Sequence, residues 1–298
     1  MDHDRLPTRP LLHFAHGNSY PAGTYRRLLD ALGERYEVRT LDMHGHDPRY
    51  PVGDGWSALV DELVAQLEGH GRPAILVGHS LGGMLSMMAA RSRPDLARCV
   101  VMLDSPVVAG WRALVWRLAK GAGLAQRLSP ARLSHKRRHL WPDRAAAYRH
   151  FGAKPLFQAW APGVLDDYLA HGLEAHPQGV TLRFRREIET DIYATLPHHM
   201  GEALRKPFPV PVGFIAGTTS EELRQAGLDA TRRLVGENLV MIEGGHLYPL
   251  ERPDETARLT HAMIGRLLGS DADLDADRAS VPGRDARARP ADAAIGQD

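Results

Sequence analysis

Short apolar segments recur along the chain, and polar residues or glycines bound each of them. Segments of this length are typical of buried β-strands. The first third of the chain and the residues just after it contain Leu11–Ala15, Tyr36–Asp42, Ala74–Val77 and Cys99–Asp104. Two more segments follow near the other end of the chain, at Val210–Gly217 and Asn238–Gly244. The pattern predicts a strand at each of these places.

Amphipathic segments separate these strands. Residues 24–36, 56–71 and 255–269 each place apolar side chains at helical spacing, so one face of each predicted helix is apolar. Strands that alternate with helices pair in parallel, because the chain crosses a face of the sheet before the next strand begins. The fold class is therefore α/β, with core parts at residues 11–110 and 201–269.

The middle of the chain, residues 111–200, shows helices and loops but no convincing buried strand. It interrupts the alternation, so we interpret it as a helical lid inserted above the sheet. Lys and Arg number 14 there against 7 Asp and Glu, a local charge of about +7. The run His135–His139 is typical of a solvated helix face, and attraction of an anionic substrate is the alternative. The region contains four of the five tryptophans, Trp111, Trp116, Trp141 and Trp160.

Composition and charge limit the partners. A formal net charge of +1 gives no global field for nucleic acid or an anionic membrane. The single cysteine, Cys99, excludes an intramolecular disulfide.

The start shows no secretory signal, and no apolar run is long enough to span a membrane, so we expect a cytoplasmic protein. Residues 1–10 form an extension, and residues 270–298, without an aromatic residue, are predicted to be disordered. The oligomeric state stays open.

The strongest chemical signal is Gly78-His79-Ser80-Leu81-Gly82, a G-x-S-x-G motif. An apolar strand leads directly into it and a helix of small residues leads out. A serine on so sharp a turn projects its hydroxyl out of the sheet, and glycines are needed because a Cβ would collide with the neighbouring elements. The helix N-terminus behind Ser80 favours developing negative charge. We predict Ser80 as a nucleophile.

Two other loops follow predicted strands and supply matching groups. In an acyl-transfer site one oxyanion donor is the N–H after the nucleophile, here Leu81, and the other comes from the loop after an early strand, where Asn18 is the candidate. His246 follows a late strand and two glycines in a chain with 16 histidines, and its position marks it as the base. No cluster of His, Cys and Asp in the sequence has convincing metal-ligand spacing, so no metal or cofactor is expected.

With these motifs in place the chain resembles the α/β-hydrolases. The similarity covers residues 11–268 and depends on "HGNS", "GHSLGG", "MLDSP" and "EGGH". It implies a mostly parallel eight-stranded sheet with Ser80 as nucleophile and His246 as base. The lid resembles those of the epoxide-hydrolase and haloalkane-dehalogenase branch in helical content. Those enzymes use an aspartate nucleophile, whereas Ser80 indicates ester-type hydrolysis through an acyl-serine.

The acid that would orient His246 has two candidate positions. Many α/β-hydrolases place an aspartate at the last position of G-x-x-D after the next-to-last strand, and here that position is Ser220. Glu221 follows it, although Ser220 and Glu221 also fit a helix N-cap and first turn. Asp104 lies at the carboxyl end of the strand after the nucleophile helix, where catalytic groups of open α/β sheets gather. We favour Asp104 and keep Glu221 as the alternative.

These predictions converge on a serine hydrolase for a small, largely apolar ester or thioester, since a tryptophan-rich lid favours apolar groups. The alternative is a protein of the same fold that binds a ligand without catalysis. The empty G-x-x-D position is the main observation in favour of that alternative.

Overall fold

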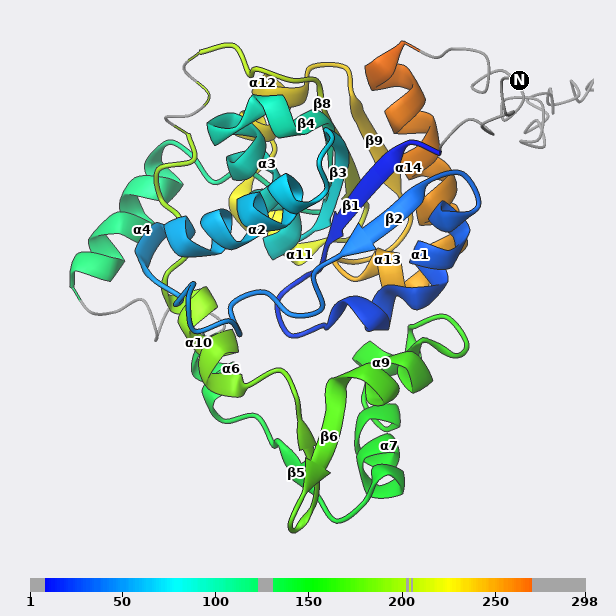
Figure 1. The fold of residues 1–298 in the computed structure, drawn as a ribbon. Coiled ribbons are helices and arrows are strands. Elements are labelled where there is room, and N and C mark those ends of the chain that lie inside the picture. The colour runs from blue at the N-terminus through cyan, green and yellow to red at the C-terminus, as the bar shows by residue number, and fades with distance from the viewer. Residues whose placement is uncertain (1–8, 123–130, 202–203, 205, 270–298) are drawn as a thin grey trace, which may run out of the picture.

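A computed structural model describes residues 9–122, 131–201, 204 and 206–269. Its centre is a six-stranded sheet in the order β2-β1-β3-β4-β8-β9, and every pairing is parallel (Figure 1). The strands are β1 (Leu11–Ala15), β2 (Glu37–Thr40), β3 (Ala74–His79), β4 (Ala97–Leu103), β8 (Val212–Gly217) and β9 (Leu239–Ile242). All predicted strands are present.

The expectation of eight strands is wrong for the described residues, where the central sheet has six. The hydrophobic pattern offered a strand segment for each of these six and no others, and the larger number came from the family resemblance alone. Strands β2 and β9 are less buried than predicted. They are the two edge strands of the sheet, so each has a strand neighbour on one side only.

Helices cover both faces of the sheet. Helices α1 (Arg26–Gly33) and α14 (Pro253–Leu268) pack on one face, and α2 (Ser57–Gly69), α3 (Leu81–Ser92) and α12 (Asp229–Val235) lie on the other (Figure 1). Along β4, Val101 belongs to the apolar cluster of the first face, and Val100 and Met102 belong to that of the second. This two-sided burial explains why the strand sequence is continuously apolar.

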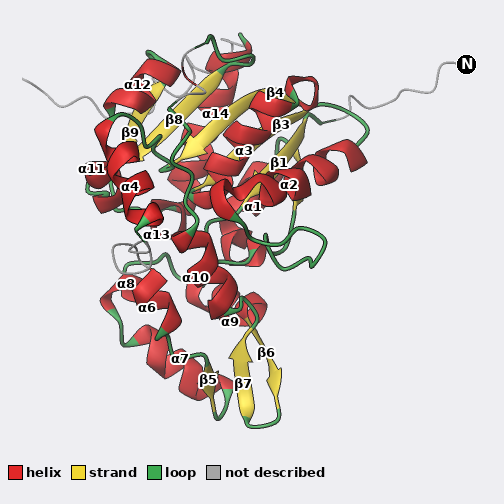
Figure 2. Cartoon of the chain, turned by 90° about the vertical axis from the view of Figure 1, so that its left-hand side faces the viewer, coloured by secondary structure: helices red, strands yellow, loops and turns green. Residues whose placement is uncertain are grey.

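Residues 111–200, between β4 and β8, are here called the insertion, and most of its described elements lie outside the central sheet and the helices that cover it (Figure 2). It contains a three-stranded antiparallel sheet in the order β5-β7-β6, which Figure 2 shows at the end farthest from the central sheet. Its elements are α4 (Trp111–Gly121), α6 (Ala131–His135), β5 (Leu140–Trp141), α7 (Arg144–Gly152), α8 (Pro155–Gln158), α9 (Val164–Gly172), β6 (Leu173–His176), β7 (Gly179–Leu182) and α10 (Arg186–Ala194). The sequence showed no convincing buried strand here and so gave no sign of β5–β7, because these strands are short and few of their residues are buried.

Aromatic side chains hold the insertion together and join it to the main core. Trp160 contacts Phe157 with ring centroids 4.5 Å apart and Tyr168 at 5.7 Å. Tyr20, from the loop after β1, packs against both Trp160 and Tyr168. Of the four tryptophans, Trp141 and Trp160 are buried, whereas Trp111 is 66% exposed, so the tryptophans do not gather around one site.

The remaining short helices connect these layers. They are η1 (Ala22–Tyr25), η2 (Asp54–Trp56), η3 (Pro94–Leu96), α11 (Glu221–Ala226) and α13 (Tyr248–Glu251). Most of the predicted N-terminal extension and the whole of the predicted tail, residues 270–298, lie outside the described residues. Within the described part of the chain, no helix is long and apolar enough to cross a membrane.

Candidate active site

Ser80 lies on a strained turn between β3 and α3. Its backbone has φ 53° and ψ −116°, a conformation that residues with a side chain rarely adopt. A Cβ on Gly78 would collide with the Gly82 backbone, and a Cβ on Gly82 would collide with the Ala15 carbonyl in β1. These contacts agree with the steric argument for the glycines of the motif, because α3 packs directly on the strands here.

A chain of hydrogen bonds joins Ser80, His246 and Asp104. The Nε2 atom of His246 lies 3.0 Å from the Ser80 hydroxyl, and its Nδ1 atom lies 2.7 Å from Oδ2 of Asp104. Each residue follows a different parallel strand, β3, β9 or β4, at its carboxyl end. The sheet therefore gathers at one edge three groups that are far apart in the sequence.

The structure distinguishes the two candidate acids. Asp104 is fully buried, and its Oδ1 accepts a hydrogen bond of 2.9 Å from the Gly217 N–H. The Ser220 hydroxyl donates to Oδ2 of Asp104 at 2.5 Å and accepts from the Leu223 N–H. Glu221 instead forms an exposed ion pair with Arg224. Ser220, at the position of the expected acid, thus supports a carboxylate that comes from another strand.

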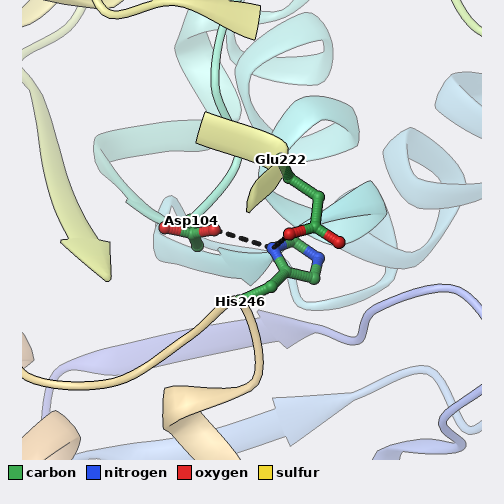
Figure 3. A group of neighbouring side chains, drawn as sticks. All are labelled: Asp104, Glu222 and His246. Atoms are coloured by element: carbon green, nitrogen blue, oxygen red, sulfur yellow. Dashed lines mark hydrogen bonds and ion pairs between the residues drawn. The ribbon is translucent and has the colours of Figure 1, made fainter. Parts of the chain in front are cut away.

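Glu222 was not identified from the sequence, yet its Oε2 lies 3.8 Å from Nδ1 of His246 (Figure 3). Burial lowers the pKa of His246, but the hydrogen bond to Asp104 and the charges of Glu222, Asp104 and Glu251 outweigh it, so the pKa lies above its ordinary value. The acidic pair after Ser220 was visible in the sequence. Only the direction of the first turn of α11 decides which of the two glutamates faces the histidine.

Asp104, Glu222 and His246 also have ligand atoms close enough together to hold a metal ion, all within 4.8 Å. The imidazole atom involved is Nδ1, which is the atom that faces Asp104. A cation there would have to displace the Nδ1 proton and its hydrogen bond, so metal ligation and this hydrogen bond exclude one another.

The predicted oxyanion donors lie on two elements next to Ser80. Leu81 is the first residue of α3, where a helix leaves its N–H without an intrahelical acceptor. Asn18 is buried in the loop after β1, and its side chain donates to the Glu189 carbonyl oxygen of α10 at 3.2 Å. The insertion therefore contacts the loop that carries the second predicted donor.

His79 connects the same loop to His246. The Gly17 N–H donates to the Tyr25 hydroxyl at 3.2 Å, and that hydroxyl lies 2.7 Å from Nδ1 of His79. The Nε2 atom of His79 lies 2.9 Å from the His246 carbonyl oxygen. Burial and the neighbouring His246 lower the pKa of His79 to about 3, so its ring stays neutral and bridges the two loops. The sequence motif contained His79 but gave no sign of this bridge.

Comparison with known proteins decides the family. Residues 14–259 match the pattern of the alpha/beta hydrolase family. The chain belongs to that family. Solved structures agree with the fold: E-2-(acetamidomethylene)succinate hydrolase matches with a TM-score of 0.67 at 22% identity, over 88% of this chain and 92% of that one. A thioesterase domain from the curacin biosynthetic pathway matches with a TM-score of 0.66 at 18% identity, over 84% of this chain and 90% of that one.

Relatives of this alpha/beta hydrolase include lipases and esterases. The lipase LipV of Mycobacterium tuberculosis is 28% identical over 84% of this chain and 91% of its own length. A pimeloyl-(acyl-carrier protein) methyl ester esterase of Xanthomonas campestris pv. campestris is 26% identical over 90% of this chain and 100% of its own. The 2-(acetamidomethylene)succinate hydrolase of Mesorhizobium japonicum is 34% identical, but the match spans 32% of this chain and 35% of that protein. The alpha/beta hydrolase described here is thus a hydrolytic enzyme.

Proposed function

We propose that this alpha/beta hydrolase cleaves a carboxylic ester or thioester of a small, largely apolar substrate through an acyl-serine intermediate. The observation that carries the proposal is the unbroken chain from the Ser80 hydroxyl through His246 to the buried carboxylate of Asp104. The esterase and lipase relatives support the same class of reaction.

In this mechanism His246 removes the proton from Ser80 as its oxygen attacks the acyl carbon. The Leu81 and Asn18 N–H groups stabilise the oxyanion, and His246 returns the proton to the leaving oxygen or sulfur. Asp104 holds Nδ1 protonated, so Nε2 is free to accept the Ser80 proton. Water then attacks the acyl-serine with His246 as base, which releases the acid and restores Ser80.

The insertion is proposed to act as the lid of this site. Its contact with the Asn18 loop supports that role, as does the packing of Tyr20 against Trp160 and Tyr168. The apolar faces of these rings fit an apolar acyl or alcohol group.

A fluorophosphonate probe tests the proposal, because it reacts with an activated serine. We expect wild type to be labelled and to hydrolyse p-nitrophenyl hexanoate, and we expect Ser80→Ala to do neither. Ser86→Ala is a matched control, since Ser86 is a buried serine of α3, the helix that follows Ser80, and lies outside the motif. Absence of labelling and of hydrolysis in wild type would contradict the proposal and favour a ligand-binding protein.

That alternative loses its main support, because a carboxylate does lie beside His246. In this proposal Asp104 takes the place of the missing acid of the G-x-x-D position, and its hydrogen bonds with His246 and with the Ser220 hydroxyl support that assignment.

A further inference from the structure

The insertion contains a cavity of about 410 Å³ between α6, α7 and α10. Four of the eight described residues in its wall are lysine or arginine, and Glu189 is the only carboxylate among these eight. The wall includes the side chains of Lys136, Arg137, Arg138, Lys154, Glu189 and Tyr193. Three of the cations belong to the run His135–His139, which the sequence indicated as a solvated face.

The positive charge of this cavity is only partly neutralised. Glu189 is buried, and its Oε2 pairs with Arg137 at 3.0 Å. Among the described residues, Lys136, Arg138 and Lys154 form no ion pair in the structure. Burial and the charge of Arg137 lower the pKa of Lys154, so the cations are close enough to repel one another. An anion in the cavity would relieve this repulsion.

One residue of the cavity wall also contacts the loop that carries a predicted oxyanion donor. The Glu189 backbone oxygen accepts the hydrogen bond from Asn18, whose own N–H is the predicted oxyanion donor. Burial raises the pKa of Tyr20 to about 12, and the charges of Arg137 and Glu222 both act on this phenol. Tyr193, in the cavity wall, is subject to the same two charges. Both tyrosines are therefore within electrostatic range of the cavity wall and of the glutamate beside His246.

We infer that this cavity binds an anionic terminus of the ester substrate, a carboxylate or a phosphate, while the ester carbonyl lies at Ser80. Arg138 and Lys154 are the proposed ligands, because Arg137 already pairs with Glu189. Guanidinium and ammonium groups form charge-assisted hydrogen bonds with both kinds of anion. The inference depends on the proposed function and narrows it to esters that carry an apolar chain with a charged end.

Paired substrates test this inference. We would compare kcat/KM for mono-p-nitrophenyl adipate and for p-nitrophenyl hexanoate, which have acyl chains of equal length with a charged or a neutral end. Mono-p-nitrophenyl esters of diacids from succinate to suberate vary the distance between the ester carbonyl and the charged end. A p-nitrophenyl ester with a terminal phosphate distinguishes a carboxylate site from a phosphate site. We expect the best charged substrate to exceed its neutral counterpart about tenfold at low salt.

The double variant Arg138→Gln/Lys154→Met should lose this preference and keep the activity on p-nitrophenyl hexanoate. Arg98→Gln is the matched control, since Arg98 is an exposed arginine near the amino end of β4 and should change neither rate. A preference that is absent, or that survives in the double variant, overturns the inference.

A binding measurement separates this inference from the proposed function. In Ser80→Ala, which is expected to be inactive, calorimetry measures the binding of adipate and of phenyl phosphate to the cavity without any catalysis. Binding of either anion that the double variant weakens about tenfold supports the site even if no ester is hydrolysed. Failure of both anions to bind overturns the inference, while hydrolysis of the neutral ester leaves the proposed function standing.

Discussion

At the scale of single residues, the two candidate acids, Asp104 and Glu221, and the neighbouring Glu222 differ in what each can do. Asp104 is buried and hydrogen-bonded to Nδ1, Glu222 is half exposed at 3.8 Å from that atom, and Glu221 points to solvent toward Arg224. A buried, fully hydrogen-bonded carboxylate fixes a tautomer, whereas an exposed one at this distance acts mainly through its charge.

Replacing Asp104 tests the first of these roles. We expect Asp104→Asn to lower kcat on p-nitrophenyl hexanoate by about 10³–10⁴-fold, because the amide no longer stabilises the imidazolium or the correct tautomer. Glu221→Gln is the control and should leave kcat unchanged. Near-normal kcat in Asp104→Asn, with its circular dichroism spectrum intact, would show that another group supports His246.

Glu222 should affect the pH profile. The proposed base, His246, must be neutral to act, so we expect kcat/KM to rise as pH increases through its pKa. The negative charge of Glu222 contributes to the raised pKa, alongside Asp104 and Glu251, and its removal lowers that pKa. In Glu222→Gln the acid limb of kcat/KM against pH should therefore move to lower pH, measured at low salt to limit screening. The adjacent Glu221→Gln should show no such movement, and equal profiles for both variants would contradict the assignment.

At the scale of elements, the turn from β8 into α11 has two functions at once. The Ser220 side chain caps α11 by accepting the Leu223 N–H at 3.1 Å, and it also donates to Asp104. The Gly217 N–H, at the end of β8, donates to the other oxygen of the same carboxylate. The helix start and the strand end therefore fix the position of the acid.

Removing the Ser220 hydroxyl should weaken both functions. We expect Ser220→Ala to cost about 1–2 kcal/mol in the free energy of unfolding, since a cap and a buried hydrogen bond are lost. The value of kcat should also fall, whereas Ser220→Thr keeps a hydroxyl and should restore most of both. Thr219→Ala changes the exposed neighbour, and urea unfolding should show it close to wild type. If Ser220→Ala and Thr219→Ala give the same free energy of unfolding and the same kcat, the Ser220 hydroxyl contributes to neither stability nor catalysis.

At the scale of the whole molecule, buried neutral histidines connect stability to pH. Burial and neighbouring imidazoles lower the pKa of His13 to about 3 and that of His16 well below its usual value, and His79 behaves in the same way. In the unfolded chain these rings titrate near 6.5, so below that pH the unfolded state binds protons that the folded state does not.

The free energy of unfolding should therefore fall as the pH decreases from about 6.5 toward 3. Above that window these three rings should not make the free energy of unfolding depend on pH. Three such protons give a slope of at most about 4 kcal/mol per pH unit. Urea unfolding between pH 7.5 and 5 measures the slope of the free energy of unfolding against pH. His13→Gln should remove about one third of the slope that the three histidines produce. A free energy of unfolding that stays constant across this interval would rule out neutral burial of these residues.

How much the sequence could reveal differs between these scales. The strands were predictable because burial on both faces leaves a continuous apolar run, as in β3. Ser80 was predictable because a strand, two glycines and a helix specify one sharp turn. The short strands β5–β7 were not, since few of their residues are covered and their pattern is weak. The number of strands in the sheet was wrong where it depended on resemblance.

The sequence by itself determined the order of elements, the strained turn at Ser80 and the loops that carry Asn18 and His246. These features depend on neighbouring residues, and local sterics and burial leave them little choice. Only the tertiary structure decided that Asp104 meets His246 while Glu221 turns away. It also decided that Ser220 supports that carboxylate and that Arg138 and Lys154 line the same cavity. Such contacts join residues distant in the chain, and they depend on strand register and on helix direction, which no local pattern encodes.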